Sequence, residues 1–254
     1  MSLMTPAVLD RQTIGDSDSR RNEQGRGARR RAQGIPPLET GDYLSRAEFE
    51  RRYMAMPHVK KAELVEGVVF MPSPVYFRSH GEPHSTVMGW LFSYVAATPG
   101  LKLADNTSLR LDLDNEVQPD AMLFRLETMG GQCRIANDDF LEGPPELIVE
   151  VAASSASYDM HSKRRVYRRN GVQEYLVFLT LEEEVAWWFL EEGEYKRFLP
   201  DDHGILRSQV FPGLWLHPEH FWSNHLTDLL DTLKQGLAAQ EHVDFATKLA
   251  QQIP

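Results

Sequence analysis

The stretch Glu146-Leu-Ile-Val-Glu150-Val151 predicts a buried β-strand that carries a carboxylate in its middle. A strand covered on both faces is normally a continuous apolar run. An ionised side chain within it costs several kcal/mol unless a cation or hydrogen bonds compensate. Pro119-Asp120-Ala-Met-Leu-Phe places a second carboxylate at the start of a strand, where proline is tolerated. Two such carboxylates lining one cleft predict a metal site.

Two further glutamates are candidates for the same cleft. Glu63 and Glu66 lie three residues apart in a predicted strand that contains Gly67. They therefore point to opposite faces unless a bulge intervenes, and only one of them need face the cleft.

The helix that follows the Glu150 strand offers a third set of polar side chains. Asp159, Lys163 and Tyr167 recur at four-residue steps, which places them on one helical face. A lysine held near carboxylates can orient a water molecule or offset charge that develops on a phosphate.

The composition is that of an ordinary globular protein. The chain has 254 residues, 42% of them hydrophobic, enough for one large domain or one domain with appendages. No apolar run approaches the ~18–20 residues that span a bilayer, and no signal-peptide pattern is found. The single Cys133 excludes an internal disulfide. We therefore expect a cytoplasmic protein without a membrane segment.

Charge is unevenly distributed along the chain. The net charge of −10 argues against a protein whose whole surface attracts nucleic acid. Residues 1–37, however, carry seven arginines against four acidic residues and few large apolar side chains. We predict a disordered basic tail there, either a solvated extension or an arm that contacts DNA. A folded domain is predicted over 38–216 and a C-terminal helical extension over 217–254.

The order of predicted elements indicates a mixed α/β fold rather than a doubly wound one. Ser45-Arg-Ala-Glu48 has the pattern of a capping box, in which the serine side chain accepts the Glu48 backbone N–H. Apolar residues at helical spacing from Phe221 to Leu237 predict one amphipathic helix, used in core packing or in dimerisation. Strands are predicted over 63–71, 101–105, 108–113, 119–125, 146–152, 173–180, 184–190 and 194–199, and helices over 45–56, 82–97 and 158–169.

Taken in order, these motifs resemble the Uma2 (DUF820) family of the PD-(D/E)XK nuclease superfamily. The resemblance covers about residues 40–216. The matching motifs are Ala62-Glu63-Leu-Val-Glu66-Gly67-Val-Val, Met71-Pro-Ser-Pro74 followed by His84, Pro119-Asp120, Pro145-Glu-Leu-Ile-Val-Glu150-Val151, and Asp159-x3-Lys163-x3-Tyr167-x3-Gly171-Val-x-Glu174-Tyr175.

The resemblance implies a restriction-endonuclease-like core, a central mixed β-sheet flanked by helices. It also implies that Asp120, Glu150 and the backbone carbonyl of Val151 hold a divalent metal ion, Mg²⁺ or Mn²⁺, for which hard oxygen ligands are suited. Glu63 resembles a further acidic residue of the superfamily site, and Glu66 stays open as the alternative.

One position departs from the superfamily pattern. The lysine of (D/E)XK should follow two residues after Glu150, where this chain has Ala152. Uma2-like sequences supply a lysine from the next helix, and Lys163 is the matching residue. Asp159 and Tyr167, on the same helical face, are possible additional site residues.

Other polar residues have weaker claims on the site. His80-Gly-Glu82-Pro-His84 mimics a metal-binding spacing, but its glycine and proline predict no helix, so it is not a helical zinc motif. His84 alone is a candidate near the site. Arg164 and Arg168, in a basic run, are predicted to be either solvated or in contact with nucleic-acid phosphates.

These observations predict a metal-dependent endonuclease that hydrolyses phosphodiester bonds, with DNA as partner. Without the resemblance, Asp120 could equally cap a turn and Glu150 pair with an arginine. The alternative function is a weakly active or inactive relative that binds nucleic acid or a protein, which the acidic net charge and Ala152 favour. A structural homodimer would rest on the C-terminal helix only.

Overall fold

The structure, a computed structural model, describes residues 34–252. The predicted disordered tail falls almost wholly outside this range, and residues 253–254 also lie outside it. No helix in the described range is long and apolar enough to cross a membrane.

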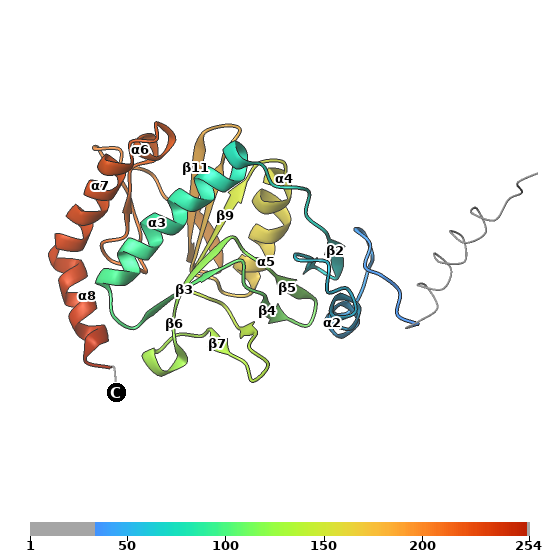
Figure 1. The fold of residues 1–254 in the computed structure, drawn as a ribbon. Helices are drawn as coiled ribbons and strands as arrows, with labels where there is room; N and C mark the ends of the chain where they lie inside the picture. The colour runs from blue at the N-terminus through green and yellow to red at the C-terminus, as the bar shows by residue number, and fades with distance from the viewer. Residues whose placement is uncertain (1–33, 253–254) are drawn as a thin grey trace, which may run out of the picture. The chain divides into compact units, whose positions relative to one another are not determined.

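The described residues form two six-stranded sheets. The one with the longer strands, called the larger sheet here, has the order β12-β11-β10-β9-β6-β3. Its two central strands, β9 and β10, run parallel, and the other neighbours are antiparallel. The sheet is therefore mixed, as predicted (Figure 1). Its strands are β3 (Leu101–Asp105), β6 (Ala121–Arg125), β9 (Leu147–Ala152), β10 (Glu174–Leu179), β11 (Glu184–Glu191) and β12 (Glu194–Arg197).

A second six-stranded sheet, not separated from the first by the sequence prediction, has the order β2-β1-β5-β4-β8-β7. A separate two-stranded pair, β13 with β14, contributes Leu206 and Leu216 to the core cluster that contains Trp90. The bounds are β1 (Glu63–Val65), β2 (Val68–Phe70), β4 (Leu109–Asp112), β5 (Asn115–Val117), β7 (Arg134–Ile135), β8 (Leu141–Glu142), β13 (Leu206–Arg207) and β14 (Trp215–Leu216).

The predicted continuous strand over 63–71 is wrong, because the chain reverses within it. Glu66 and Gly67 both have positive φ, 53° and 76°, and connect β1 to β2 in a two-residue hairpin. Left-handed backbone at both central positions fits the right-handed twist of the flanking strands. The glycine is needed there, since a Cβ on it would lie 2.8 Å from the Tyr43 ring.

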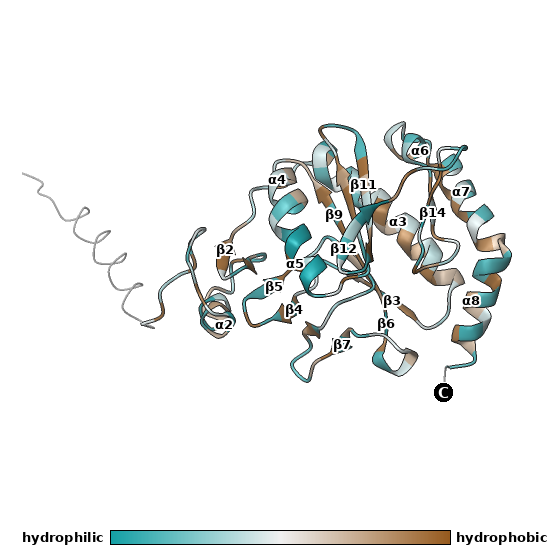
Figure 2. Cartoon of the chain, turned by 180° about the vertical axis from the view of Figure 1, so that it is seen from behind, coloured by the Kyte–Doolittle hydropathy of each residue, from teal (hydrophilic) through white to brown (hydrophobic). Residues whose placement is uncertain are grey.

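The two faces of the larger sheet are covered by different helices (Figures 1 and 2). Val149 of β9 shares a core cluster with Trp90 of α3, whereas Ile148 shares one with Val166 of α5. Side chains alternate along a strand, so Glu150 faces the α5 side. The helical segments are α2 (Arg46–Met54), η1 (Phe77–Gly81), α3 (Glu82–Ala97), η2 (Glu127–Met129), α4 (Ala156–Tyr158), η3 (Asp159–Lys163), α5 (Arg164–Arg169), α6 (Pro218–Trp222), α7 (Leu226–Ala238) and α8 (Gln240–Ala250).

The predicted single C-terminal helix is also wrong. The chain forms α6, α7 and α8, because Asn224 is left-handed (φ 56°) after α6 and Ala239 is extended (φ −68°, ψ 145°) between α7 and α8. Leu229 and Leu233 of α7 and Leu249 of α8 are buried in the core cluster that contains α3. Core packing is therefore one role of this segment, and dimerisation stays a prediction.

Ser45 precedes α2, but its side chain makes no capping hydrogen bond. The Glu48 backbone N–H donates to the Ser45 backbone carbonyl at 3.1 Å instead. The Glu48 carboxylate does not reach back either, because Arg51 and Arg52 each donate to it at 2.7 Å. The predicted capping box is replaced by this arginine pairing.

Candidate active site

Glu150 lies at the centre of a buried cluster of charges. It is 2% exposed and projects from β9 toward the segment η3–α5. The Lys163 ammonium, itself 2% exposed, lies 2.9 Å from Glu150 Oε1, 3.0 Å from Glu63 Oε1 and 3.4 Å from Asp159 Oδ1. Tyr167 donates its hydroxyl hydrogen to the same Glu150 oxygen at 2.9 Å. Three carboxylates therefore surround one lysine.

Strand pairing places Asp120 beside this cluster. In the antiparallel register of β6 with β9, Ala121 pairs with Val149, which brings Asp120 level with Glu150. Asp120 Oδ2 accepts the Val151 backbone N–H at 2.8 Å. This hydrogen bond fixes the carboxylate of Asp120 next to the Val151 peptide.

Two side chains that the sequence prediction missed complete the surroundings of Asp120. Lys61 Nζ lies 3.2 Å from Asp120 Oδ1, and His80 Nε2 lies 3.8 Å from the same atom. His80 Nδ1 is 3.1 Å from the Val151 carbonyl oxygen. Lys61 was detectable, because it stands two residues before Glu63 and shares its face if β1 is extended backward.

These groups line one cavity of about 840 Å³. Its polar part contains four carboxylates and three lysines. Its apolar part is formed by the loop from Phe70 to Tyr76, with Tyr158 and Leu181. The charged groups lining the cavity are Lys60, Lys61, Glu63, Asp120, Glu150, Asp159 and Lys163, with His80 beside them.

Burial and mutual charge set the protonation of the cluster. Burial raises the pKa of Glu150 to about 8, although the Lys163 ammonium opposes the shift. Burial also raises the pKa of Asp159. Burial would raise the pKa of Asp120, but Lys61 and His80 outweigh it and the pKa is lowered. Burial would lower the pKa of Lys163, but the surrounding carboxylates raise it well above its ordinary value. Lys163 is therefore held as an ammonium.

The donor set fits a divalent cation in chemistry and in charge. Glu63, Asp120, Glu150 and Asp159 offer hard oxygen atoms, and the only ammonium groups bonded to them among the described residues are those of Lys61 and Lys163. Two negative charges are thus in excess when all are ionised. Within residues 34–252 no group of three or more His, Cys, Asp or Glu side chains is arranged to hold a metal ion, because three of these carboxylates surround Lys163 instead.

Glu66 does not reach the cavity. It occupies the β1–β2 turn, where its carboxylate pairs with Arg165 at 2.9 Å and with Arg169 at 3.4 Å. Between the two alternatives left open by the sequence, Glu63 is therefore the one placed with Asp120 and Glu150.

His84 does not line the cavity. Its Nε2 is 3.1 Å from the backbone oxygen of Asp120 and 3.2 Å from Asp105 Oδ1. The expectation that Gly81 and Pro83 prevent a helix here is wrong. The π-helical turn η1 runs directly into α3, and Pro83 stands in the first turn of α3, where its missing N–H is not needed.

Arg164 and Arg168 do not line the cavity. The Arg164 guanidinium lies 5.1 Å from the centre of the Trp188 ring. Arg168 donates to the Gly193 backbone carbonyl at 3.0 Å and pairs with Glu194. Their role as nucleic-acid contacts stays a prediction.

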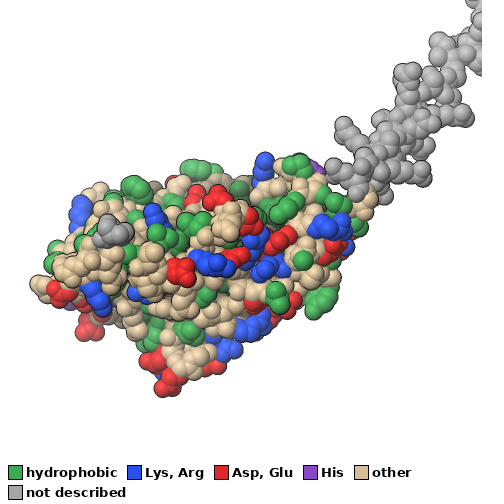
Figure 3. Space-filling model, turned by 90° about the horizontal axis from the view of Figure 1, so that it is seen from below, with side chains coloured by type: hydrophobic (Ala, Val, Ile, Leu, Met, Phe, Trp, Pro, Cys, Tyr) green, Lys and Arg blue, Asp and Glu red, His purple; other side chains and the backbone are tan. Residues whose placement is uncertain are grey.

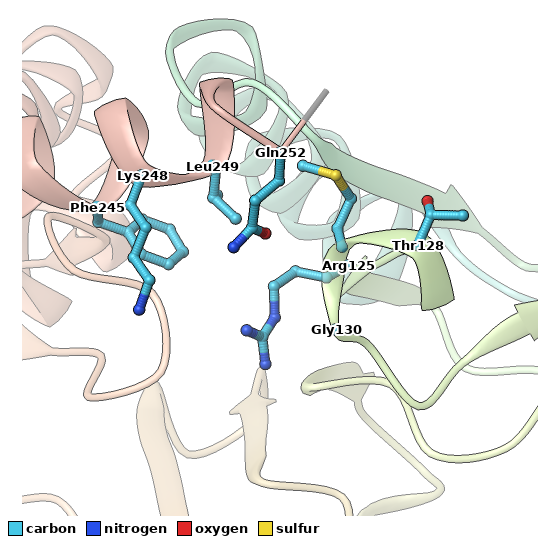
Figure 4. A pocket seen from close by; sticks show the side chains of 8 residues that line it. Arg125, Thr128, Gly130, Phe245, Lys248, Leu249 and Gln252 are labelled. Atoms are coloured by element: carbon cyan, nitrogen blue, oxygen red, sulfur yellow. The ribbon is translucent and has the colours of Figure 1, made fainter. Parts of the chain in front are cut away.

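A second cavity, of about 300 Å³, lies between η2 and α8 (Figure 4). Arg125, Lys248 and Gln252 contribute its polar groups, and Met129 and Leu249 its apolar floor. The Arg125 guanidinium also pairs with the buried Glu146 at 3.1 Å. This cavity contains no carboxylate and is separate from the cluster around Glu150.

A mixed sheet flanked by helices, with carboxylates from adjacent strands at one cavity, defines the restriction-endonuclease-like class that the sequence predicts. Residues 46–219 match the family described as "Uma2: Putative restriction endonuclease". This match covers more than half of the chain, and the protein belongs to the Uma2 family.

One solved structure and the curated proteins complete the comparison. The solved structure is of "a putative nuclease belonging to DUF820" from Anabaena variabilis ATCC 29413. It is 16% identical, with 72% of this chain and 97% of the other covered and a TM-score of 0.48. No curated protein matches the sequence.

Proposed function

We propose that this protein is a metal-dependent endonuclease that hydrolyses phosphodiester bonds in DNA, with Mg²⁺ or Mn²⁺ as cofactor. The observation that carries the proposal is the convergence of Glu63, Asp120, Glu150 and Lys163 on one cavity. Membership of the Uma2 family supports it.

In this proposal Asp120, Glu150 and the Val151 carbonyl hold the metal ion, with Glu63 as a further ligand. When bound, the ion supplies an activated water and stabilises negative charge on the phosphate. The Val151 N–H keeps the Asp120 carboxylate oriented. Tyr167, which donates to Glu150, is a positioning residue.

Lys163 has a distinct role in the proposal. Its raised pKa keeps it protonated, so it cannot take a proton from water as a general base. It instead offers a buried positive charge that offsets the charge developing on the phosphate. Asp159 forms an ion pair with Lys163 at 3.4 Å and acts as a positioning residue.

The test is cleavage of supercoiled plasmid DNA with Mg²⁺ or Mn²⁺, compared with the same reaction in EDTA. We expect nicked or linear product only with metal. Glu191→Gln is a matched control, because Glu191 lies at the end of β11, half exposed and paired with Lys196. Absence of cleavage with either metal, in a folded protein, would contradict the proposal.

The second candidate is a catalytically weak or inactive protein that binds nucleic acid or a protein partner through the same cavity. It is favoured by the engagement of Lys163 with three carboxylates and by the absence, within the described range, of a ready metal-binding group. DNA binding without cleavage, and no heat of Mg²⁺ or Mn²⁺ binding in calorimetry, would support it.

A further inference from the structure

Two lysines pair with the carboxylates of the 840 Å³ cavity, and they differ in how many of their hydrogen atoms are taken. An ammonium group has three N–H donors and no acceptor. Three carboxylates lie within 3.4 Å of the Lys163 nitrogen, and the Lys163 side chain is only 3% exposed. Lys163 therefore has a protein partner for each of its hydrogens and cannot turn to a ligand without giving one up.

Lys61 lies nearer to solvent and has fewer partners. Its ammonium donates to Asp120 Oδ1 at 3.2 Å and to Asn106 Oδ1 at 3.3 Å, and these are its two acceptors in the part of the chain that the structure describes. Its side chain is 24% exposed and lines the cavity. One of the three hydrogens of Lys61 therefore remains for a group that enters the cavity.

The two partners of Lys61 are themselves held in place. Asn106 follows β3 with left-handed backbone, φ 47°, and its N–H donates to the Asp120 carbonyl at 3.4 Å. The Asn106 side-chain amide donates to Asp105 at 2.8 Å, which leaves its oxygen to accept from Lys61. The fold thus places the Lys61 ammonium beside Asp120 in advance, as a preorganised positive charge.

The charge of the cavity makes a direct cation contact necessary for an anionic substrate. With Lys60 counted, the lining has four carboxylates and three lysines, so negative charge is in excess when all are ionised. On the face seen in Figure 3, lysine and arginine side chains are interspersed with acidic ones, and the net charge of the chain is −10. That face offers no continuous positive track, so phosphate contacts have to come from individual cations at the site.

The ion pair of Lys61 with Asp120 also predicts a competition. Asp120 Oδ2 accepts the Val151 N–H, so Oδ1, the oxygen paired with Lys61, is the one that remains for a cation. Like charges repel, so Oδ1 holds the ammonium less strongly when it also serves as a metal ligand. A phosphate oxygen is then the anionic partner that Lys61 can take in its place.

We infer that Lys61 makes the direct contact with the substrate phosphate at this site, and that Asp120 and Asn106 position it for that contact. Lys163 acts from behind the carboxylates, as a charge that the phosphate does not touch. This inference rests on the proposed function and deepens it, because it names the residue that binds the phosphate.

The test measures two affinities of Lys61→Met, a change that removes the charge and keeps much of the side-chain volume. Fluorescence anisotropy with a labelled duplex oligonucleotide, Ca²⁺ replacing Mg²⁺ to prevent cleavage, gives the affinity for DNA at several salt concentrations. We expect binding to weaken by about tenfold, and the slope of log affinity against log salt to fall by about 1. Calorimetry without DNA should show Mn²⁺ bound roughly threefold more tightly, because a competing cation is gone.

Two further variants serve as controls. Lys61→Arg keeps a positive charge and should keep the affinity for DNA within about threefold of the parent protein. Lys102→Met makes the same change at an exposed lysine of β3 that does not line the cavity, and it should leave both affinities unchanged. Circular dichroism checks that each variant is folded.

An unchanged affinity for DNA or an unchanged salt slope in Lys61→Met would overturn the inference. A parallel loss of DNA and Mn²⁺ binding would also overturn it, because Lys61 would then be a structural residue. Metal-dependent cleavage by the parent protein, together with normal DNA binding by Lys61→Met, would leave the proposed function standing and remove only this inference. DNA binding that depends on Lys61 without cleavage in either metal would remove the proposed catalysis and support the phosphate contact.

Discussion

Two carboxylates on adjacent strands, Glu150 of β9 and Glu174 of β10, are equally buried and held in opposite ways. Glu174 is 0% exposed and accepts the backbone N–H groups of Gln209 and Val210 at 2.8 and 3.0 Å. Trp187 Nε1 donates to it at 3.1 Å, and the Ser208 hydroxyl lies within 3.0 Å of both its oxygens. Every bond to Glu174 comes from a neutral group, and Glu174 does not line the 840 Å³ cavity.

Glu150 has a different environment. Its partners are a charged lysine and a tyrosine, and Asp120, Asp159 and Glu63 raise its pKa further after burial. It also lines the cavity. The difference shows that burial alone does not mark a functional carboxylate, since hydrogen bonds can satisfy a structural one. Crowding of like charges beside an accessible cavity is the more specific sign.

The largest expected effect is a loss of activity when a proposed metal ligand is replaced. Asp120→Asn and Glu150→Gln should each lower metal-dependent DNA cleavage by at least about 100-fold while the protein stays folded, because each replaces a proposed carboxylate ligand by a neutral amide. Plasmid nicking and circular dichroism measure the two properties. Full activity in Glu150→Gln would remove the distinction drawn between Glu150 and Glu174, and full activity in Asp120→Asn would contradict the role of Asp120 as a ligand.

The next prediction concerns the charge that distinguishes the cavity. Lys163→Met keeps much of the side-chain volume and should lower turnover by roughly 100-fold. Metal affinity should be retained or raised, because a competing cation is gone. Lys163→Arg should not restore turnover, since a guanidinium is wider and its geometry differs. Single-turnover cleavage and calorimetry separate the two effects, and a parallel loss of metal binding would make Lys163 a structural residue.

Glu174 should show the converse behaviour. Glu174→Ala leaves the N–H groups of Gln209, Val210 and Trp187 without their acceptor and should lower the free energy of unfolding by roughly 3–5 kcal/mol. Cleavage per folded molecule should be unchanged. Urea denaturation and plasmid nicking, corrected for the fraction of folded protein, check this. A loss of cleavage in the protein that remains folded would show that Glu174 takes part in cleavage.

The smallest expected effect is on the pH dependence of stability and concerns a third buried carboxylate, that of Glu116. Burial, and then the hydrogen bond to Glu50, raise the pKa of Glu116 on β5 to about 8. The folded state therefore binds a proton that the unfolded state releases near its ordinary pKa of 4.5. This contribution to stability is complete below about pH 4.5 and is lost as the pH rises through about 8.

Glu116→Gln removes that titration and keeps the shape of the side chain. Between pH 5 and pH 9 the variant should lose less stability than the parent protein, by roughly 1–3 kcal/mol. Thermal or urea unfolding across this pH range, with Glu191→Gln in parallel, is the measurement. Equal pH dependence of the parent protein and Glu116→Gln would show that Glu116 is ionised in the folded state.

Local sequence pattern was sufficient for much of the fold and part of the site. The apolar runs around Asp120 and Glu150 predicted their strands, and the four-residue spacing of Asp159, Lys163 and Tyr167 predicted a shared helical face. Lys163 does lie at Glu150. These features depend on the 2.0- and 3.6-residue periods of strands and helices, which the sequence alone contains.

Local sequence pattern did not predict the features that depend on a reversal of the chain or on contacts between distant segments. Glu66 is removed from the cavity by a two-residue hairpin, and the Phe221–Leu237 segment is broken at Asn224. Lys61 and His80 reach Asp120 from segments at least 40 residues away in the chain. Propensity does not say which segments meet, because pairing of distant strands is decided by the packing of the whole core.

The sequence by itself therefore determined which residues can carry charge on buried strands and on one helical face. Only the tertiary structure decided that Glu150 shares its space with Lys163 and three other acids, while Glu174 is enclosed by neutral donors. The physical reason is that protonation and affinity for a cation depend on distance, desolvation and hydrogen bonding at the folded site. These quantities cannot be read from the order of residues, because they are set only when the strands and helices pack.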